Sequence, residues 1–348
     1  MITNEDIEAV ARKLMNAFVG LRWTEDDVRG LVDQLGWEWA GESDGRVRVV
    51  TGLPGGDAVF VPVGAAARAW APLQEYLELA VPVSRPAPEA RAQAEEFRRV
   101  ADAVRRVLGD ATYVGAHGFA GPSGWSPEPY WGRPFLRWHQ ERTALELRAG
   151  VAGPELVLQS SEVWESWYAQ AGQGFAGVLA DRGHPLEQPR WENIGDWEQL
   201  QNSLGAFLRT LPAETLATGL TQSIPLYGLL PGEAGPLLFG ITCFEDRLYV
   251  DYTEYCVPEA ARGDNAAALG WTSRNALPPL PARFDGGAPW RVDAGGPGEV
   301  ASSEIAALIV RTARIAGVES PTGLMSGGEA MYRGQYRLAF PGLAMPTC

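Results

Sequence analysis

The stretch that decides the fold class is RPAPEARAQAEEFRRVADAVRRVLGD, residues 85–110. Its apolar residues recur every three or four positions, as on one face of a helix, and a glycine follows the last of them. These residues are Phe97, Val100, Ala101, Val104, Val107 and Leu108, followed by Gly109. Strand-like segments lie in groups before and after this helix. A parallel α/β sheet requires strands and helices to alternate, so the order predicts an α+β fold with an antiparallel sheet.

The other elements of the first half are read from the same signals. Two amphipathic helices are expected over 4–18 and 24–37, the first capped by Asn4 and the second by a capping box of Thr24 and Asp27. A short helix is expected over 160–171. Strands are expected where β-branched or alternating apolar residues are bounded by glycine or proline, at 46–52, 57–64, 75–83, 135–140, 144–150 and 155–159.

The second half begins after a change in composition. Residues 172–195 lose the periodicity and are rich in glycine and proline, which predicts a linker between domains 1–171 and 196–328, with a tail at 329–348. Each domain is expected to pack an antiparallel sheet against helices. In the second domain, helices are expected at 196–212, 258–271 and 300–318, and strands at 219–226, 236–243 and 247–255, with a hairpin turn at FEDR, 244–247.

The tripeptide LGW occurs twice, at 35–37 and 269–271. Both copies lie where a predicted helix ends. Glycine takes up the left-handed conformation that follows a last helical turn, and the tryptophan folds back onto that turn. The flanking patterns do not align, so the two copies predict two helix ends and no internal repeat.

Composition limits the classes of partner. The formal charge is −14 over 348 residues, and it is spread evenly, with −7 on each side of residue 172. Phosphate backbones and anionic lipid surfaces are therefore not expected as partners, whereas a basic protein would be steered towards this chain. Solubility alone also explains uniform acidity. No run approaches the roughly 18 apolar residues of a membrane helix, and residues 1–18 do not form a signal peptide, so a cytoplasmic location is expected.

Candidate catalytic groups are sparse. His117, His139 and His184 stand apart, and the three cysteines, Cys243, Cys256 and Cys348, have no metal-ligand spacing. We therefore expect no metal, no cofactor and no disulfide framework. An enzyme whose site is assembled in space near His117 or His139 remains the main alternative.

Three short motifs resemble functional sites, but two lack a defining residue and the third also fits a structural role. GPSGW, 121–125, lacks the second glycine of a nucleophile elbow, and GLPGGD, 52–57, lacks the lysine of a phosphate loop. PPLPAR, 278–283, fits a polyproline ligand but also fits a rigid connector.

The candidate interface residues come from two places. Trp125, Tyr130 and Trp131 crowd one loop, 119–135, and aromatic residues are enriched at protein interfaces. Asp251 and Glu254, in DYTEY, form a close pair of carboxylates at a strand end. The alternatives are core packing for the aromatic residues and a solvated strand end for the acids.

The second half resembles a known family in the order of its motifs. DWEQLQNSLGAFLRTLP, RLYVDYTEY, AAALGW, APWRV and IVRTARIAGVESPTGL follow one another between 196 and 324. This order resembles the TY-Chap domain, a type III secretion chaperone-like module of actinobacterial proteins. The first half, from RWTEDDVRGLVDQLGWEW through VRRVLGDATYV and RWHQERTALELRAG to WESWY, is similar to an actinobacterial domain of unknown function.

The resemblance implies binding without catalysis and a secretion-chaperone-like fold in the C-terminal half. Such domains are associated with secretion chaperones and with polymorphic toxin and immunity systems. The expected function is therefore a chaperone for a secreted effector, or an immunity protein that neutralises a toxin, with another protein as the partner. A self-associating structural protein, such as a homodimer, is the third alternative.

Overall fold

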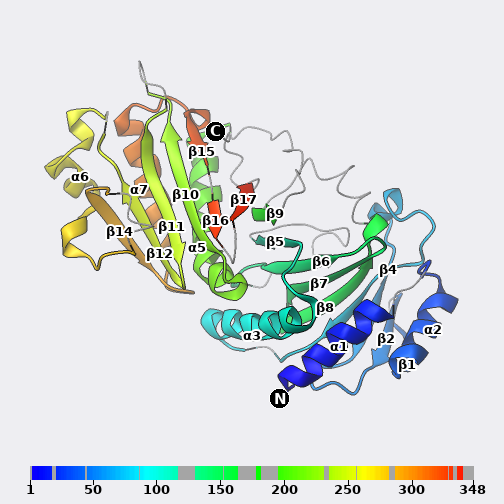
Figure 1. Ribbon diagram of the computed structural model, residues 1–348. Helices are drawn as coiled ribbons and strands as arrows, with labels where there is room; N and C mark the ends of the chain where they lie inside the picture. The colour runs from blue at the N-terminus through cyan, green and yellow to red at the C-terminus, as the bar shows by residue number, and fades with distance from the viewer. Residues whose placement is uncertain are drawn as a thin grey trace. The chain divides into compact units, whose positions relative to one another are not determined.

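The computed structural model describes residues 2–17, 21–43, 45–85, 87–116, 130–151, 153–163, 178–181, 195–230, 235–255, 257–281, 287–327, 329–331 and 335–339. The chain forms two compact units, residues 1–175 and 176–348 (Figure 1). Their boundary falls inside the predicted linker, 172–195.

The described part of the first unit contains one antiparallel sheet of eight strands. The sheet order is β1–β2–β3–β4–β8–β7–β6–β5, and each strand runs antiparallel to its neighbours. The strands are β1 (Glu38–Ser43), β2 (Arg46–Val50), β3 (Ala58–Pro62), β4 (Tyr76–Pro82), β5 (Tyr113–Ala116), β6 (Phe135–His139), β7 (Thr143–Gly150) and β8 (Gly153–Ser160). The predicted fold class, α+β with an antiparallel sheet, is confirmed.

Helices cover one face of this sheet. They are α1 (Asn4–Asn16), α2 (Glu25–Leu35) and α3 (Ala90–Leu108), with a 3-10 turn, η1 (Ala66–Ala69). Helices α1 and α3 pack on each other and on β7 and β8, above the fully buried Leu145, Leu147, Leu156 and Leu158 (Figure 1). Apolar burial of this kind, at about 25 cal/mol per Å², is the main force that holds the layers together.

The predicted N-cap of α1 needs correction, whereas Thr24 is confirmed as the N-cap of α2. Thr3, and not Asn4, caps α1, because its hydroxyl accepts from the Asp6 N–H while Asp6 accepts from the Thr3 N–H. At α2 the box is half formed: Thr24 accepts from the Asp27 N–H, but the Asp27 carboxylate accepts from Arg22 N.

The second unit has its own antiparallel sheet. Its order is β13–β14–β12–β11–β10; β10 then pairs with β15 and with β16, β16 pairs with β17, and β17 with β9. The strands are β9 (Val178–Asp181), β10 (Thr221–Gly228), β11 (Leu237–Phe244), β12 (Arg247–Tyr252), β13 (Thr272–Ser273), β14 (Trp290–Gly295), β15 (Leu324–Ser326), β16 (Glu329–Met331) and β17 (Gln335–Ala339). The predicted linker is therefore wrong in part, because it contributes β9, and β16 and β17 lie in the predicted tail.

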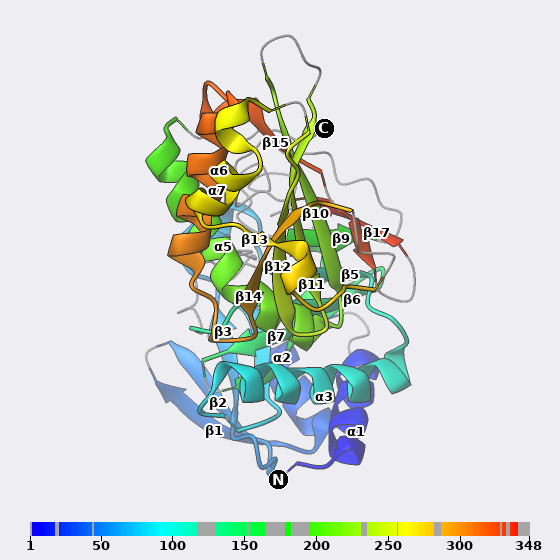
Figure 2. The same cartoon turned by 90° about the vertical axis from the view of Figure 1, so that its left-hand side faces the viewer.

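Helices of the second unit lie on one face of its sheet (Figure 2). They are α5 (Trp197–Thr218), α6 (Asp264–Leu269) and α7 (Ser302–Ala316), with 3-10 turns η3 (Glu259–Ala261), η4 (Arg274–Ala276) and η6 (Pro321–Gly323). Helix α5 does not end at Pro212 as predicted, because the buried residues beyond it, including Ala213 and Ala217, continue its packing. The helix predicted over 258–271 is broken at Gly263, whose φ is 53°.

Both LGW triplets are confirmed as helix ends. Gly36, with φ 72°, follows α2, and Gly270, with φ 117°, follows α6. The next N–H returns to the last turn in each copy, from Trp37 N to Val32 O and from Trp271 N to Ala266 O. The two indoles differ in environment: Trp271 is buried, whereas Trp37 is only partly covered.

The FEDR turn carries a strained residue that allows a stability test. Glu245 has φ 57° in this two-residue turn, a conformation that costs a residue with a Cβ about 1 kcal/mol. We expect Glu245→Gly to raise the free energy of unfolding by up to about 1 kcal/mol. Urea denaturation measures it, with Gly36→Ala as the opposite control, expected to lower stability. A less stable Glu245→Gly protein would contradict the assignment of strain.

Candidate functional site

A hollow of the second unit lies at one end of its sheet. Its volume is about 620 Å³. The start of β11, the end of β12, the residue after η3 and the segment before β14 form its walls. The lining residues are Pro236, Leu237, Thr253, Glu254, Tyr255, Arg262, Gly287, Ala288 and Pro289. Clefts of this size are large enough to take a side chain or a short peptide segment.

Apolar side chains are exposed at this end of the sheet. Tyr255 is 79% exposed, and Leu237 and Leu229 are also exposed, although large apolar side chains are usually covered. Leu229 follows β10 directly, and its N–H donates to Gly323 O at 2.7 Å. Three strand ends therefore present apolar groups together, which is typical of an interaction site.

Backbone contacts hold these strand ends in place. Thr253 N donates to Leu238 O at 2.9 Å, and the Thr253 hydroxyl donates to Leu237 O. Gly228 N donates to Pro236 O at 3.0 Å. The ends of β10, β11 and β12 are thus joined before any partner binds, which lowers the entropy cost of binding.

Glu254 is a fixed carboxylate in the wall of the hollow. Its Oε2 accepts from Gly263 N at 2.8 Å and from Trp290 Nε1 at 3.0 Å. The Gly263 N–H, and then the Trp290 indole, hold the pKa of Glu254 below its ordinary value. The stability that this shift gives is present above the ordinary pKa and is lost as pH falls through the lower folded-state pKa. Glu254 is therefore ionised at neutral pH, with Oε1 facing no donor among the described residues.

Asp251 does not accompany Glu254 at the surface, so Asp251 is wrong both as a candidate interface residue and as part of a solvated strand end. Strand alternation turns Asp251 onto the sheet face, where it is buried and accepts two bonds from Arg291 on β14, at 2.6 and 3.1 Å. Arg291 is 0% exposed, and its guanidinium lies 5.9 Å from the ring centre of Tyr249. This pair joins β12 to β14 beside the hollow.

The predicted aromatic interface in the first unit separates into different environments. Trp131 is 4% exposed and packs edge-on against Phe97, so it belongs to the core and not to a surface. Tyr130 is exposed, and its hydroxyl donates to Pro88 O at 2.9 Å. Trp125 lies outside the described residues.

The groups proposed for an enzyme are only partly described. His139 is half-buried at the end of β6, edge-on to Tyr113 at 6.1 Å. Cys243 is buried, and burial raises the pKa of its thiol to about 12. His117, His184, Cys256 and Cys348 lie outside the described residues. Within the described ranges, no three histidine, cysteine, aspartate or glutamate side chains are placed to share a metal ion.

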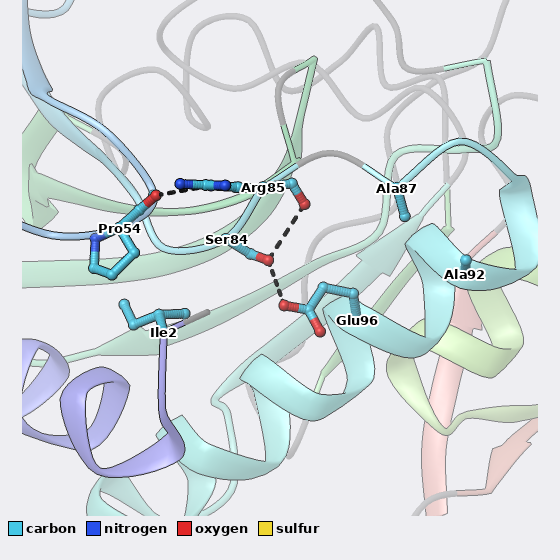
Figure 3. A pocket seen from close by; sticks show the side chains of 8 residues that line it. Ile2, Pro54, Ser84, Arg85, Ala87, Ala92 and Glu96 are labelled. Atoms are coloured by element: carbon cyan, nitrogen blue, oxygen red, sulfur yellow. Dashed lines mark hydrogen bonds between the residues drawn. The ribbon is translucent and has the colours of Figure 1, made fainter.

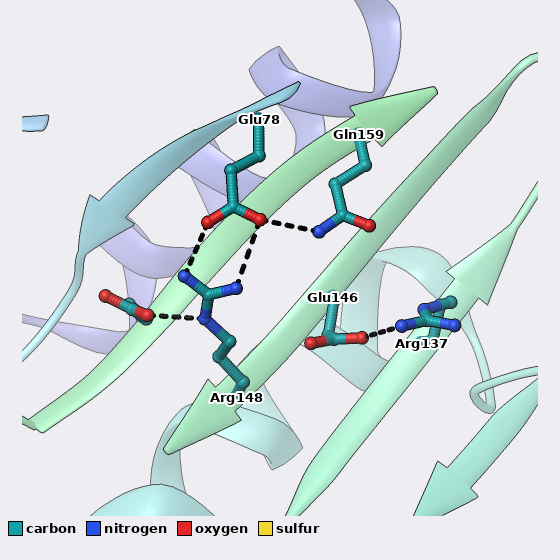
Figure 4. A network of polar contacts seen from close by, with 6 residues as sticks. Glu78, Arg137, Glu146, Arg148 and Gln159 are labelled. Carbon is teal, nitrogen blue, oxygen red and sulfur yellow. Dashed lines mark hydrogen bonds and ion pairs between the residues drawn. The ribbon is translucent and has the colours of Figure 1, made fainter. Parts of the chain in front are cut away.

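Sequence reasoning missed a network of charges on the first sheet. On the face away from α1 and α3, Arg148 donates to Glu78 at 2.7 Å and to Glu155 at 2.5 Å (Figure 4). Gln159 donates to Glu78 at 2.7 Å, and Arg137 pairs with Glu146 one strand further along. Desolvation lowers the pKa of the buried Arg137 despite Glu146.

The geometry of this charge network indicates a structural role, because its pairs join neighbouring strands. The acids and arginines pair with one another across β4, β8, β7 and β6, and removing one member of a buried pair is costly. The signal in the sequence was the alternation in ALELRAG, where Glu146 and Arg148 occupy every second position. Their partners depend on strand register, which the sequence does not give.

Comparisons with known proteins assign this chain to no family. No family model, no curated protein and no solved structure matches the chain. Among the described helices, none combines the length and the apolar character needed to cross a membrane.

Proposed function

We propose that this protein is a cytoplasmic, non-catalytic module that binds another polypeptide through the hollow at Glu254 and Tyr255. The observation that carries the proposal is the exposed Tyr255 beside Leu237, in a hollow whose walls are already joined by hydrogen bonds. An exposed aromatic residue at a concave site is the type of residue that anchors protein–protein interfaces.

The Glu254 carboxylate and the apolar walls of the hollow suit a segment with a basic residue beside a large apolar one. The apolar side chain would enter between Leu237, Tyr255 and Pro289. A lysine or arginine beside it would donate to the free oxygen of Glu254, and Arg262 would face the segment's carbonyl groups. The charge of −14 would add to the rate of association with such a partner.

The biological role follows from the resemblance to TY-Chap domains. A chaperone would hold an effector before secretion, and an immunity protein would cover a toxin. Both roles need a stable binding surface and no reacting groups. A basic toxin, such as a nuclease, fits the acidic surface best.

The test begins with the tagged full chain in its native host. A partner recovered with it is purified, and its Kd is measured for the unchanged protein and for Tyr255→Ala. We expect Tyr255→Ala to weaken binding roughly thirtyfold, the loss of a central aromatic anchor. Glu254→Gln should weaken binding less at high salt than at low salt, because salt screens the charge.

Tyr130→Ala is the matched control, because it removes an exposed tyrosine from the first unit, and Leu73→Ala removes an exposed leucine there. Both should leave the Kd unchanged. Loss of binding in Tyr130→Ala alone would move the interface to the first unit. Equal binding by Tyr255→Ala and the unchanged protein would refute the hollow as the binding site.

The two alternatives predict other outcomes. If the protein is an enzyme near His117 or His139, replacing both histidines abolishes its biological activity, whereas binding through the hollow survives. If it is a self-associating structural protein, size measurement without a partner shows a concentration-dependent oligomer.

A further inference from the structure

A second hollow, of about 390 Å³, lies in the first unit and takes no part in the proposed function. It lies between the N-terminal segment, the turn between β2 and β3, the segment after β4 and α3 (Figure 3). The lining residues are Ile2, Pro54, Gly55, Ser84, Arg85, Ala87, Ala92 and Glu96. We refer to it as the Arg85 hollow.

Two glycines allow the chain to close tightly around the segment after β4. A Cβ on Gly55 would lie 2.2 Å from Pro82 O, so only glycine fits the turn there. Gly153, with φ 116°, would place a Cβ 3.2 Å from Ser84 O. The turns at Gly55 and Gly153, which are far apart in the sequence, therefore both pack closely against residues 82–85. The Arg85 hollow is thus formed before any ligand enters.

The acidic group of this hollow is already neutralised. Ser84, which is buried, donates to the Glu96 carboxylate (Figure 3). Arg99 donates to both Glu96 oxygens, at 2.8 and 2.7 Å, and to Asn4 at 2.6 Å. Burial opposes ionisation of Glu96, but the bonds from Arg99 and Ser84 outweigh it, so its pKa lies below its ordinary value. Glu96 thus presents no uncompensated negative charge.

Arg85 supplies an available positive charge at the same place. Its Nε lies 3.5 Å from Pro54 O, a weak contact, and its two terminal nitrogens have no partner among the described residues. Ile2, Ala87 and Ala92 give the hollow apolar walls. A guanidinium with two free N–H groups binds a carboxylate in a bidentate manner.

We propose that the Arg85 hollow binds a small carboxylate with an apolar body, its carboxylate on Arg85 and its chain against Ile2, Ala87 and Ala92. The volume lies within the range of clefts that hold small molecules. A neutral ligand of the same shape would lose the charged contact. A cationic ligand would meet Arg85 with no free acid to compensate.

The test uses hexanoate and hexanamide, titrated into the full chain and followed by ligand-observed NMR. We expect saturable hexanoate binding that is about tenfold tighter than hexanamide binding. Arg85→Gln should weaken hexanoate about tenfold and leave hexanamide unchanged. Arg12→Gln, an exposed arginine on α1, is the matched control and should change neither.

A second variant tests the apolar wall without touching the charge. Ala92→Leu keeps a good helix former in α3 and fills the hollow, so it should abolish binding of both probes while circular dichroism stays unchanged. Tyr255→Ala should leave hexanoate binding intact, which separates this proposal from the polypeptide-binding site. No saturable hexanoate binding to the unchanged protein, or equal binding by Arg85→Gln, would overturn the proposal.

Discussion

Replacing Asp251 by alanine is expected to lower the free energy of unfolding by about 3–5 kcal/mol. The change leaves the guanidinium of Arg291, which is 0% exposed, without the carboxylate that accepts from its Nε and Nη2. A buried charge that loses its partner costs far more than the ion pair contributed. Chemical denaturation measures this loss of stability, and hydrogen exchange of the amides in β12 and β14 assigns the loss to the second unit.

Two further variants show whether the unpaired buried charge of Arg291 causes the loss of stability. Asp293→Ala breaks the pair between Arg247 and Asp293 on the same two strands, but Arg247 is exposed, so the expected loss is below about 1 kcal/mol. Asp251→Leu combined with Arg291→Met removes both buried charges and should recover most of the stability. If Asp251→Ala costs no more than Asp293→Ala, then water reaches Arg291 and the pair is not a buried one.

Trp271→Ala is expected to destabilise the core of the second unit strongly. Its ring stacks on Tyr252 at 5.1 Å and on Phe239 at 5.9 Å between centroids, and Nε1 donates to Thr312 Oγ1 at 3.0 Å. Truncating a buried tryptophan costs about 3–5 kcal/mol, because the cavity does not close. Urea denaturation followed by circular dichroism measures the loss.

Trp37→Ala is the matched control, since it alters the same position of the other LGW triplet. Trp37 is only partly covered, so we expect a loss of about 1 kcal/mol. The helix end itself stays in both variants, because the glycines and their returning N–H groups remain. Equal losses for the two tryptophans would mean that the triplet acts only as a helix end, whatever surrounds it.

Local sequence patterns predicted the elements whose apolar residues recur with a helical spacing or whose turn residues are distinctive. The residues of 85–110 formed α3, and FEDR formed the hairpin turn, because spacing and turn chemistry act within a few residues. Strand β14 was missed: APWRV follows a proline-rich loop and looks like its continuation, and only pairing with β12 reveals it. The strand at 178–181 was missed for the same reason.

The candidate site was predicted in part. Glu254 lies at the hollow as its position after a strand indicated, and Tyr255 beside it was overlooked because a single exposed tyrosine has no pattern. Asp251 was misplaced because its environment depends on the register between β12 and β14. Trp131 was misplaced because aromatic clustering does not distinguish a surface loop from the edge of a core.

The joining of β4 to β8 has a consequence for how the nascent chain folds. Glu78 and Gln159 are neighbours in the sheet but stand 81 residues apart in sequence. On the ribosome, the apolar strand β4, YLELAVP, is synthesised long before its partner β8. Until β8 is made, β4 is therefore an unpaired edge strand that can pair with other chains. Chains cut between β4 and β8 should therefore aggregate, and slow synthesis of this interval should lengthen the time during which chaperones are needed.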